Sequence, residues 1–157
     1  MAQYRYQQQY YQRLRLQQAR WDSRGYNYYN DPYYSTPASY RYSFGGRYHQ
    51  TNRYGADLMR QAVNYGYREG LRAGQADRQD RWGNDYRSSY AYEDANYGYN
   101  GYYVSQDAYN HYFRQGFQRG YDDGYDDRYR YGQRDRNGEY AILAAVLGSI
   151  LGLQLLN

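Results

Sequence analysis

The distribution of aliphatic side chains limits what this chain of 157 residues can fold into more than any other feature. Alanine and the initial Met aside, the first 140 residues contain only Leu14, Leu16, Leu58, Met59, Val63, Leu71 and Val104. Nine more aliphatic side chains lie within the last seventeen residues. So few cannot fill an ordinary core. The core must therefore be aromatic, and each buried Tyr hydroxyl needs a hydrogen-bond partner.

Tyrosine supplies the rings and arginine the charge: 29 residues are Tyr and 20 are Arg, while Lys does not occur. The planar guanidinium stacks on aromatic faces, whereas the lysine ammonium is a compact, strongly hydrated charge. This composition indicates a chain that binds aromatic surfaces, chiefly its own or those of identical copies. The predicted contact sites are three Tyr-Arg-Tyr segments, namely Tyr4, Arg5, Tyr6, Tyr40, Arg41, Tyr42, Tyr129, Arg130 and Tyr131.

The charge pattern argues against a dedicated nucleic-acid-binding protein. The formal net charge is only +4, because 16 acidic residues are interspersed with the arginines. Nucleic-acid-binding proteins usually concentrate positive charge in a patch or tail. We therefore expect no specific nucleic-acid partner, although Tyr and Arg side by side would also suit a single strand.

No sequence motif of catalysis, cofactor binding or metal binding is present. His49 and His111 stand alone, and no nucleotide-binding loop or metal-ligand spacing occurs. The absence of Cys excludes disulfides and Cys-based zinc sites. The sequence thus predicts no enzyme, no cofactor and no metal site. The acidic residues Asp122, Asp123, Asp126 and Asp127 are expected to pair with arginines, with Asp77 and Asp123 doing so across a helix pair.

Residues 1–54 are predicted to form an N-terminal arm and an irregular linker. Residues 7–21 favour a helix by composition, but apolar residues at alternate positions leave a strand open. Residues 25–50 carry both prolines among Tyr, Asn, Ser and Gly, which predicts an extended, irregular connection. The opening Met-Ala-Gln resembles what remains after a signal peptide is cleaved, which would place the protein outside the cell.

Residues 55–132 contain an internal repeat with an offset of 46 residues. QAVNYGYREGLRAGQAD at 61–77 matches DAYNHYFRQGFQRGYDD at 107–123, with Gly70 opposite Gly116 and Asp77 opposite Asp123. Two such copies predict a helical hairpin or a pseudo-symmetric helix pair.

Each copy of the repeat carries glycines at every fourth position. These are Gly66, Gly70, Gly74, Gly116, Gly120 and Gly124. Glycine costs about 1 kcal/mol per helical position relative to Ala. Close approach of two helix backbones is the expected compensation, as in small-xxx-small packing. We therefore predict that these glycines form the helix contact.

Residues 133–157 are predicted to be a polar linker followed by an apolar C-terminal helix. The tail residues are Ile142, Leu143, Val146, Leu147, Ile150, Leu151, Leu153, Leu155 and Leu156. A helix over 140–156 would span about 25 Å, which is short of the roughly 30 Å hydrocarbon layer. Residues 141–157 are therefore expected to be buried in a shared assembly, with membrane contact as the alternative.

The paired motif resembles small, uncharacterised, secreted bacterial proteins rich in Tyr, Arg and Gly. It reads YREGLRAGQAD at 67–77 and FRQGFQRGYDD at 113–123. The resemblance covers about the middle half of the chain. It implies secretion through a signal peptide, and it implies no activity.

These features together predict a mainly α-helical protein: a glycine-striped helix pair with extended Tyr-rich arms and an apolar C-terminal helix, ordered by self-assembly. The function expected first is an extracellular structural subunit that polymerises with identical copies, with glycan or cell-surface contact as a further option. A membrane- or envelope-associated protein is the second alternative. An Arg/Tyr-rich condensate-forming or nucleic-acid-binding protein is the third.

Overall fold

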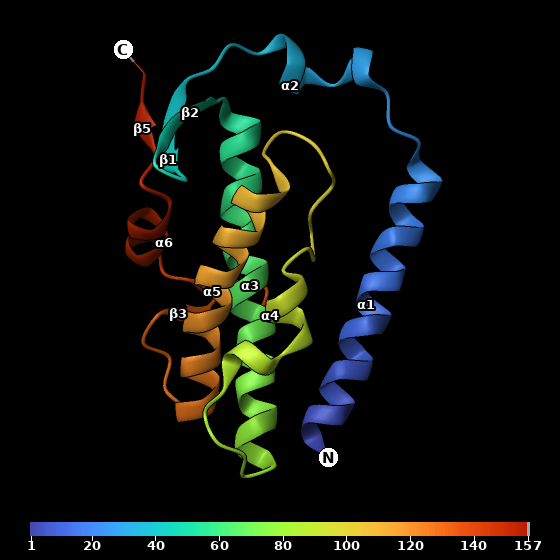
Figure 1. The fold of residues 1–157 in the computed structure, drawn as a ribbon, viewed down its shortest axis with the longest axis vertical. Coiled ribbons are helices and arrows are strands. Elements are labelled where there is room, and N and C mark those ends of the chain that lie inside the picture. The colour runs from blue at the N-terminus through green and yellow to red at the C-terminus, as the bar shows by residue number, and fades with distance from the viewer. Residues whose placement is uncertain (157) are drawn as a thin grey trace.

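The computed structural model describes residues 1–156 and is mainly helical, which confirms the predicted class. Its centre is a pair of long helices, α3 (Arg53–Gln79) and α5 (Gln106–Asp126). Asn52 caps α3 by accepting from the Tyr54 and Gly55 backbone amides, and Ser105 caps α5 by accepting from Ala108. Both helices run in the same direction (Figure 1).

The parallel arrangement excludes one of the two predicted forms of the helix pair. A helical hairpin is wrong, because a hairpin would make the helices antiparallel. The chain instead returns along the pair through residues 80–105 before α5 begins. That connection contains the 3-10 helix η2 (Tyr86–Ser88) and the short helix α4 (Tyr90–Asp94).

The N-terminal segment is helical over a longer stretch than predicted. Helix α1 (Ala2–Arg24) lies along one side of the central pair, so the first residues are not an extended arm (Figure 1). The carboxylate of Asp80, at the end of α3, accepts hydrogen bonds from the backbone amides of Ala2 and Gln3 at 2.7 and 2.8 Å. A carboxylate at a helix N-terminus satisfies donors that the helix leaves unpaired. Contact with α3 thus fixes the start of α1.

Residues 25–50 are more regular than the predicted irregular connection. They form η1 (Tyr28–Asn30), α2 (Pro32–Ser35) and a hairpin of β1 (Tyr40–Phe44) with β2 (Arg47–Thr51). The hairpin turn is Gly45-Gly46, with φ of 62° and 76°. Two successive residues with positive φ are what a tight hairpin turn requires, and Gly adopts them without strain. The prediction overlooked this Gly-Gly signal between two five-residue strands.

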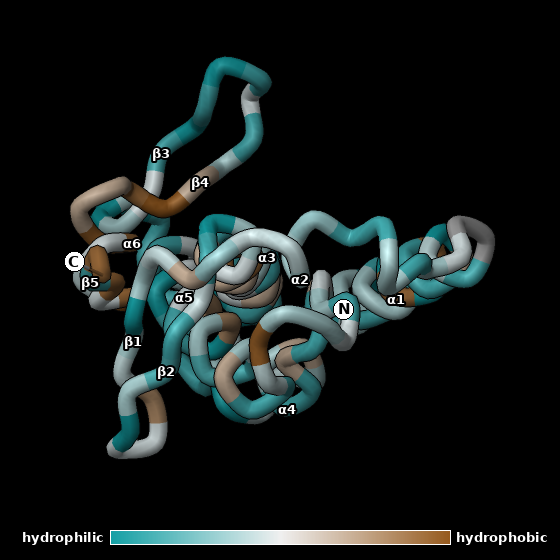
Figure 2. The backbone as a smooth tube through the Cα atoms, turned by 90° about the horizontal axis from the view of Figure 1, so that it is seen from above, coloured by the Kyte–Doolittle hydropathy of each residue, from teal (hydrophilic) through white to brown (hydrophobic). Residues whose placement is uncertain are grey.

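The C-terminal tail is not the continuous helix that was predicted. It consists of β4 (Tyr140–Ile142), α6 (Ala144–Leu151) and β5 (Gln154–Leu155), with α6 ended by Gly152 in the left-handed conformation. Strand β4 pairs with β3 (Gly132–Arg134), and β5 joins β1 to give the order β2-β1-β5. Figure 2 shows the most hydrophobic backbone gathered around this tail.

The core is aromatic, as the aliphatic count predicts. Its largest fully buried side chains are Tyr10, Tyr67, Tyr109, Tyr112, Tyr121, Phe113 and Phe117. Along α5, successive rings from Tyr109 to Tyr125 stack with centroids 5.9 to 6.5 Å apart. Rings spaced four residues apart lie on one helix face, so α5 presents a continuous aromatic ridge.

Candidate interaction sites

The six repeat glycines lie where α3 and α5 meet. A Cβ placed on Gly66, Gly70 or Gly74 would come closer than 3.0 Å to the carbonyl oxygens of Phe113, Phe117 and Tyr121, respectively. On the other helix, a Cβ on Gly116, Gly120 or Gly124 would overlap the carbonyls of Val63, Tyr67 and Leu71 in the same way. The obstacle at each position is backbone, which cannot rotate aside as a side chain can.

The packing symmetry of the pair differs from the repeat seen in the sequence. Gly66 stands to Phe113 as Gly116 stands to Val63, so positions 50 residues apart are equivalent in the contact. The sequence repeat has an offset of 46, which is shorter by about one helical turn. Because the glycines recur at every fourth position, a shift of one turn keeps glycine opposite backbone.

Two Tyr–Asp hydrogen bonds cross the helix pair, one in each direction. The Tyr67 hydroxyl on α3 donates to Asp123 on α5 at 2.7 Å. The Tyr121 hydroxyl on α5 donates to Asp77 on α3. The prediction that Asp77 and Asp123 bind arginines across the pair is therefore wrong, because each carboxylate accepts its bond across the pair from a tyrosine. Arg130 follows α5, the helix that carries Asp123, and its Nε lies 3.8 Å from that carboxylate.

Both aspartates also hold segments outside the pair. Asp123 accepts from the backbone amides of Arg130 and Tyr131, at 3.2 and 3.0 Å, and so fixes the chain that leaves α5. Asp77 accepts from the side-chain amide of Gln3 in α1. Burial and the hydrogen bonds to these carboxylates raise the pKa of Tyr67 and of Tyr121.

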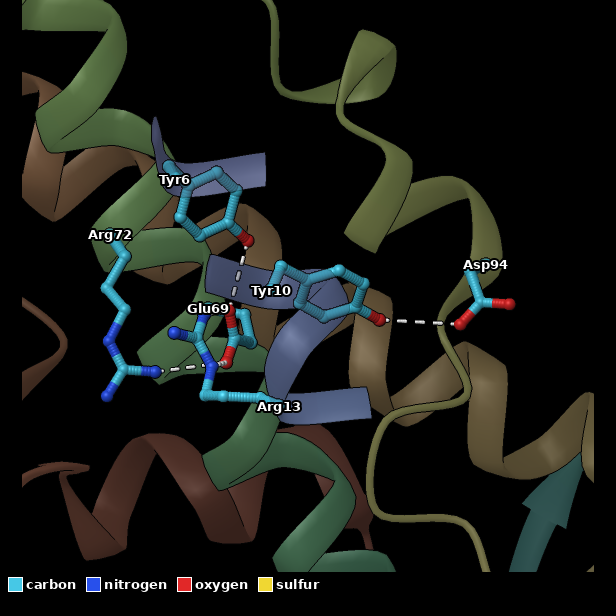
Figure 3. Close-up of polar contacts among 6 residues, drawn as sticks. All are labelled: Tyr6, Tyr10, Arg13, Glu69, Arg72 and Asp94. Atoms are coloured by element: carbon cyan, nitrogen blue, oxygen red, sulfur yellow. Dashed lines mark hydrogen bonds and ion pairs between the residues drawn. The ribbon is translucent and has the colours of Figure 1, made fainter. Parts of the chain in front are cut away.

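Helix α1 is held against α3 by a buried carboxylate, Glu69 (Figure 3). Arg13 binds it through two nitrogens, with Nε 3.0 Å from Oε1 and Nη2 2.6 Å from Oε2. Arg72 reaches Oε1 at 3.0 Å, and the Tyr6 hydroxyl reaches Oε2 at 3.1 Å. Four donors use the acceptor capacity of an ionised carboxylate, so this cluster acts as a structural clamp.

The two tyrosines of α1 beside this clamp are buried and differ in partner. Tyr6 bonds to Glu69, whereas the Tyr10 hydroxyl donates to Asp94 at the end of α4 at 3.4 Å (Figure 3). Burial, together with the nearby carboxylates, raises the pKa of both hydroxyls. No sequence pattern indicated that Glu69 is buried, because a single Glu in a helix rich in polar residues is typical of the protein surface.

The three Tyr-Arg-Tyr segments differ in burial and in the residues they contact. In the first, Tyr6 is buried while Tyr4 and Arg5 are exposed. In the second, Tyr42 is buried, and Arg41 lies over the ring of Tyr48 with its guanidinium carbon 4.6 Å from the ring centroid. In each of these two segments, one tyrosine is therefore buried within the fold.

The third segment is stacked on the neighbouring hairpin. Tyr129 packs parallel to Tyr140 with centroids 4.9 Å apart, and Arg130 lies over Tyr131 at 5.7 Å. Arg130 also pairs with Asp126 at 2.6 Å, which is the expected Arg partner for one member of the acidic cluster.

A surface not foreseen from the sequence lies between α1 and β1. We call it the 26–34 aromatic surface, and it consists of Tyr26, Tyr28, Tyr29 and Tyr34, all exposed. The Tyr29 side chain is 93% exposed, and Tyr28 packs on Tyr34 with centroids 4.2 Å apart. The sequence shows five Tyr within nine residues around Pro32, but nothing in it indicated that four of them would be exposed together.

The tail packs partly on its own chain. Ile142 and Leu151 are buried, while Val146, Leu147, Ile150 and Leu153 are half-buried against the core. Leu155 is 72% exposed and lies in β5, at the edge of the three-stranded sheet. Leu143 and Leu156 are also half-buried. An apolar residue on an unpaired sheet edge is a ready contact for another chain.

Within residues 1–156, no helix is both long and apolar enough to cross a bilayer. Across the same residues, no group of three or more His, Asp or Glu side chains is placed to hold a metal ion. Comparison with known proteins finds no matching family model, no matching curated protein and no matching solved structure.

Proposed function

We propose that this protein is a non-catalytic structural subunit that binds copies of itself and assembles into an extracellular filament or fibre. The observation that carries the proposal is the 26–34 aromatic surface. Clustered exposed rings on a protein surface mark an interaction site, because their burial in a contact is strongly favourable. The glycine-striped pair would form the rigid unit on which this surface is displayed.

Arg–Tyr contacts within the chain indicate the chemistry of the partner. Eight arginines already lie over tyrosine rings within the chain, at 4.6 to 6.0 Å from the ring centroids. Exposed arginines of a second copy, such as Arg15, Arg47 and Arg136, could stack in the same way on the 26–34 aromatic surface. The edge strand β5 and exposed Leu155 give a second contact, which replaces the predicted burial of the whole tail between copies.

The extracellular assignment rests on the resemblance of the paired motif to secreted proteins. The chain has no Cys, so disulfides cannot hold an extracellular assembly together. Stacking of Arg on Tyr-rich surfaces would do so instead. Immunodetection of the protein in the culture medium or on intact cells tests it, and detection only in lysed cells would contradict it.

The central test changes the aromatic surface alone. Replacing Tyr28, Tyr29 and Tyr34 with Ser should raise the protein concentration needed for assembly at least ten-fold, measured by sedimentation velocity and negative-stain microscopy. The matched control replaces Tyr11 and Tyr90, which are exposed and stack on each other elsewhere. Wild-type protein that stays monomeric at every concentration, or a triple variant that assembles normally, would refute the proposal.

A further inference from the structure

A cavity lies between the C-terminal half of α1 and the 96–106 segment that leads into α5. Its volume is about 660 Å³, within the range of roughly 300–1,000 Å³ that is usual for small-molecule sites. We call it the α1 cleft. A smaller cavity of about 290 Å³ adjoins it, since both are lined by Trp21 and Asn100.

Aromatic rings form one part of the lining of the α1 cleft: Trp21, Tyr26, Tyr99, Tyr102 and Tyr103. The rings of Tyr26 and Tyr102 stack face to face with centroids 3.8 Å apart, which joins the two walls. The Trp21 side chain is only half-buried, and its indole N–H has no hydrogen-bond partner among the described residues. An open indole offers a flat apolar face and a donor at its rim.

The polar side chains of the lining are amides and carboxylates: Gln18, Asn96, Asn100, Gln106, Asp22 and Asp31. The Asn100 side chain accepts from the Tyr102 backbone amide at 2.9 Å, and its Nδ2 group makes no bond to a described residue. A side-chain amide fixed through its oxygen presents its NH₂ group as a donor, while a carboxylate presents acceptors.

Asp31 is held in place by the aromatic lining. Its carboxylate accepts from the Tyr33 backbone amide at 2.9 Å and from the hydroxyls of Tyr26 and Tyr103 at 3.0 and 2.5 Å. Burial alone would raise the pKa of Asp31, but these three donors keep it below its usual value. The wall around Asp31 is therefore preorganised.

This lining selects a class of ligand. Two carboxylates, Asp22 and Asp31, line the α1 cleft and oppose phosphates and other anions there, whereas Arg20 lines the adjoining cavity. The polar groups would be left unpaired by an apolar ligand. A pyranose ring matches both parts, because its C–H face packs on an aromatic ring while its hydroxyls act as both donors and acceptors.

We propose that the α1 cleft binds a neutral oligosaccharide. Trp21 stacks on one sugar ring, and Asn100 hydrogen-bonds its hydroxyls at the point where the two cavities meet. The adjoining cavity, lined also by Gln17, Gln61 and Tyr65, receives the next sugar unit. The α1 cleft shares Tyr26 with the 26–34 aromatic surface, but the two proposed sugar contacts, Trp21 and Asn100, lie outside that surface.

Trp21 gives a direct readout of binding. The chain has two Trp, and Trp82 lies just beyond the end of α3, beside the start of α1. Trp21 is nineteen positions along α1 from Ala2, or roughly 28 Å. In a Trp82→Phe variant, all Trp fluorescence therefore comes from the α1 cleft.

The Trp82→Phe protein is titrated with neutral tetrasaccharides of α-glucose, β-glucose, mannose and N-acetylglucosamine, and with N-acetylargininamide. We expect a saturable fluorescence change with at least one sugar, and calorimetry on the wild type should give the same affinity. Trp21→Ala and Asn100→Ala should each weaken that affinity at least ten-fold by calorimetry, whereas Tyr48→Ala should leave it unchanged. Circular dichroism checks that both variants fold.

Three results would overturn the proposal. One is the absence of saturable binding by every sugar of the set. Another is saturable binding of N-acetylargininamide alone, which would make the α1 cleft a guanidinium site for a second copy. Sugar binding that survives in both folded cleft variants would also place the site elsewhere and so refute it.

Discussion

The hydroxyl of Tyr67 donates a 2.7 Å hydrogen bond to Asp123 across the contact of α3 and α5. Both side chains are buried, and Asp123 has no exposed surface. A buried carboxylate is tolerated only when donors surround it. The hydrogen bonds from Tyr67 and from the two backbone amides after α5 therefore link the helix pair to the aromatic core and to the chain that leaves α5.

We expect Tyr67→Phe to lower the free energy of unfolding by about 1–3 kcal/mol, since it leaves a buried carboxylate short of one donor while it keeps the ring. Urea unfolding followed by circular dichroism measures the change. Tyr48→Phe is the control, because Tyr48 is 68% exposed and keeps its ring beneath Arg41. Equal stabilities for the two variants would show that the Tyr67–Asp123 bond contributes nothing.

Glycine at the helix contact should be irreplaceable even by Ala. Gly70→Ala places a methyl group against the carbonyl of Phe117, and Gly120→Ala places one against that of Tyr67. Forcing the backbones apart should cost about 1–3 kcal/mol or more, despite the better helix propensity of Ala. Leu at either position should prevent folding of the pair.

Gly148→Ala is the matched control for these substitutions. Gly148 lies inside α6, and no described residue stands within 4 Å of the Cβ position. Here Ala should be neutral or stabilise the protein by up to about 1 kcal/mol. Thermal denaturation of all three variants gives the comparison, and a stabilised Gly70→Ala would show that α3 and α5 do not pack closely.

Alkaline conditions should unfold this protein. Burial raises the pKa of Tyr6, Tyr67 and Tyr121 above the usual 10.0, and that of Tyr112 to about 12. Above pH 10 the unfolded chain loses these protons and the native chain keeps them, so stability falls by about 1.4 kcal/mol per pH unit for each residue. Below pH 10 this contribution is fully present. Urea midpoints measured across this pH range test the slope, and a midpoint that stays constant to pH 12 would contradict it.

The parts of this fold that follow from sequence are those with a local signal. Glycine at every fourth position predicts helices in close contact, and the lack of aliphatic residues predicts an aromatic core with paired hydroxyls. The Gly45-Gly46 turn is an equally local signal, but the prolines and the Tyr, Asn and Ser around it favoured an irregular connection over a hairpin. Such turns outweigh composition because they fix two backbone conformations that few other residues adopt.

Long-range features could not be predicted in the same way. A repeat offset of 46 does not reveal that the helices pack with an offset of 50, because glycine every fourth residue allows both registers. Glu69 and the α1 cleft depend on how α1 lies on the central pair, and one sequence holds no signal for that contact. The apolar tail was misread because Gly152 and the partners of β4 and β5 interrupt a helix that composition alone favours.

Arginine should be needed for its planar face as well as its charge. The guanidinium carbons of Arg41, Arg53 and Arg134 lie 4.6 to 4.9 Å from the ring centroids of Tyr48, Tyr54 and Tyr140. Replacing all three with Lys keeps the net charge and weakens the stacking. At about 0.5–1 kcal/mol for each exposed contact, unfolding free energy should fall by ~1.5–3 kcal/mol.

The matched control replaces Arg15, Arg47 and Arg136 with Lys, since these exposed arginines lie over no ring of the described chain. This variant should keep wild-type stability and, if these residues stack on a second copy, assemble only at higher concentration. High salt should rescue neither set, because charge is unchanged. Identical behaviour of wild type and both variants would mean that the exclusive use of Arg has no stacking role.

The exposed edge of the three-stranded sheet gives the last prediction, which concerns assembly. Deleting residues 141–157 would remove buried Ile142 and Leu151 and so confuse folding with assembly. Leu155→Asp instead places a charge on the 72% exposed residue of β5, where a second chain would pair. We expect at least a ten-fold rise in the concentration needed for assembly, with unfolding free energy unchanged. Leu16→Asp, at a 61% exposed position on α1, is the control and should assemble normally. If both variants assemble like the wild type in sedimentation velocity, the tail takes no part in the contact between copies.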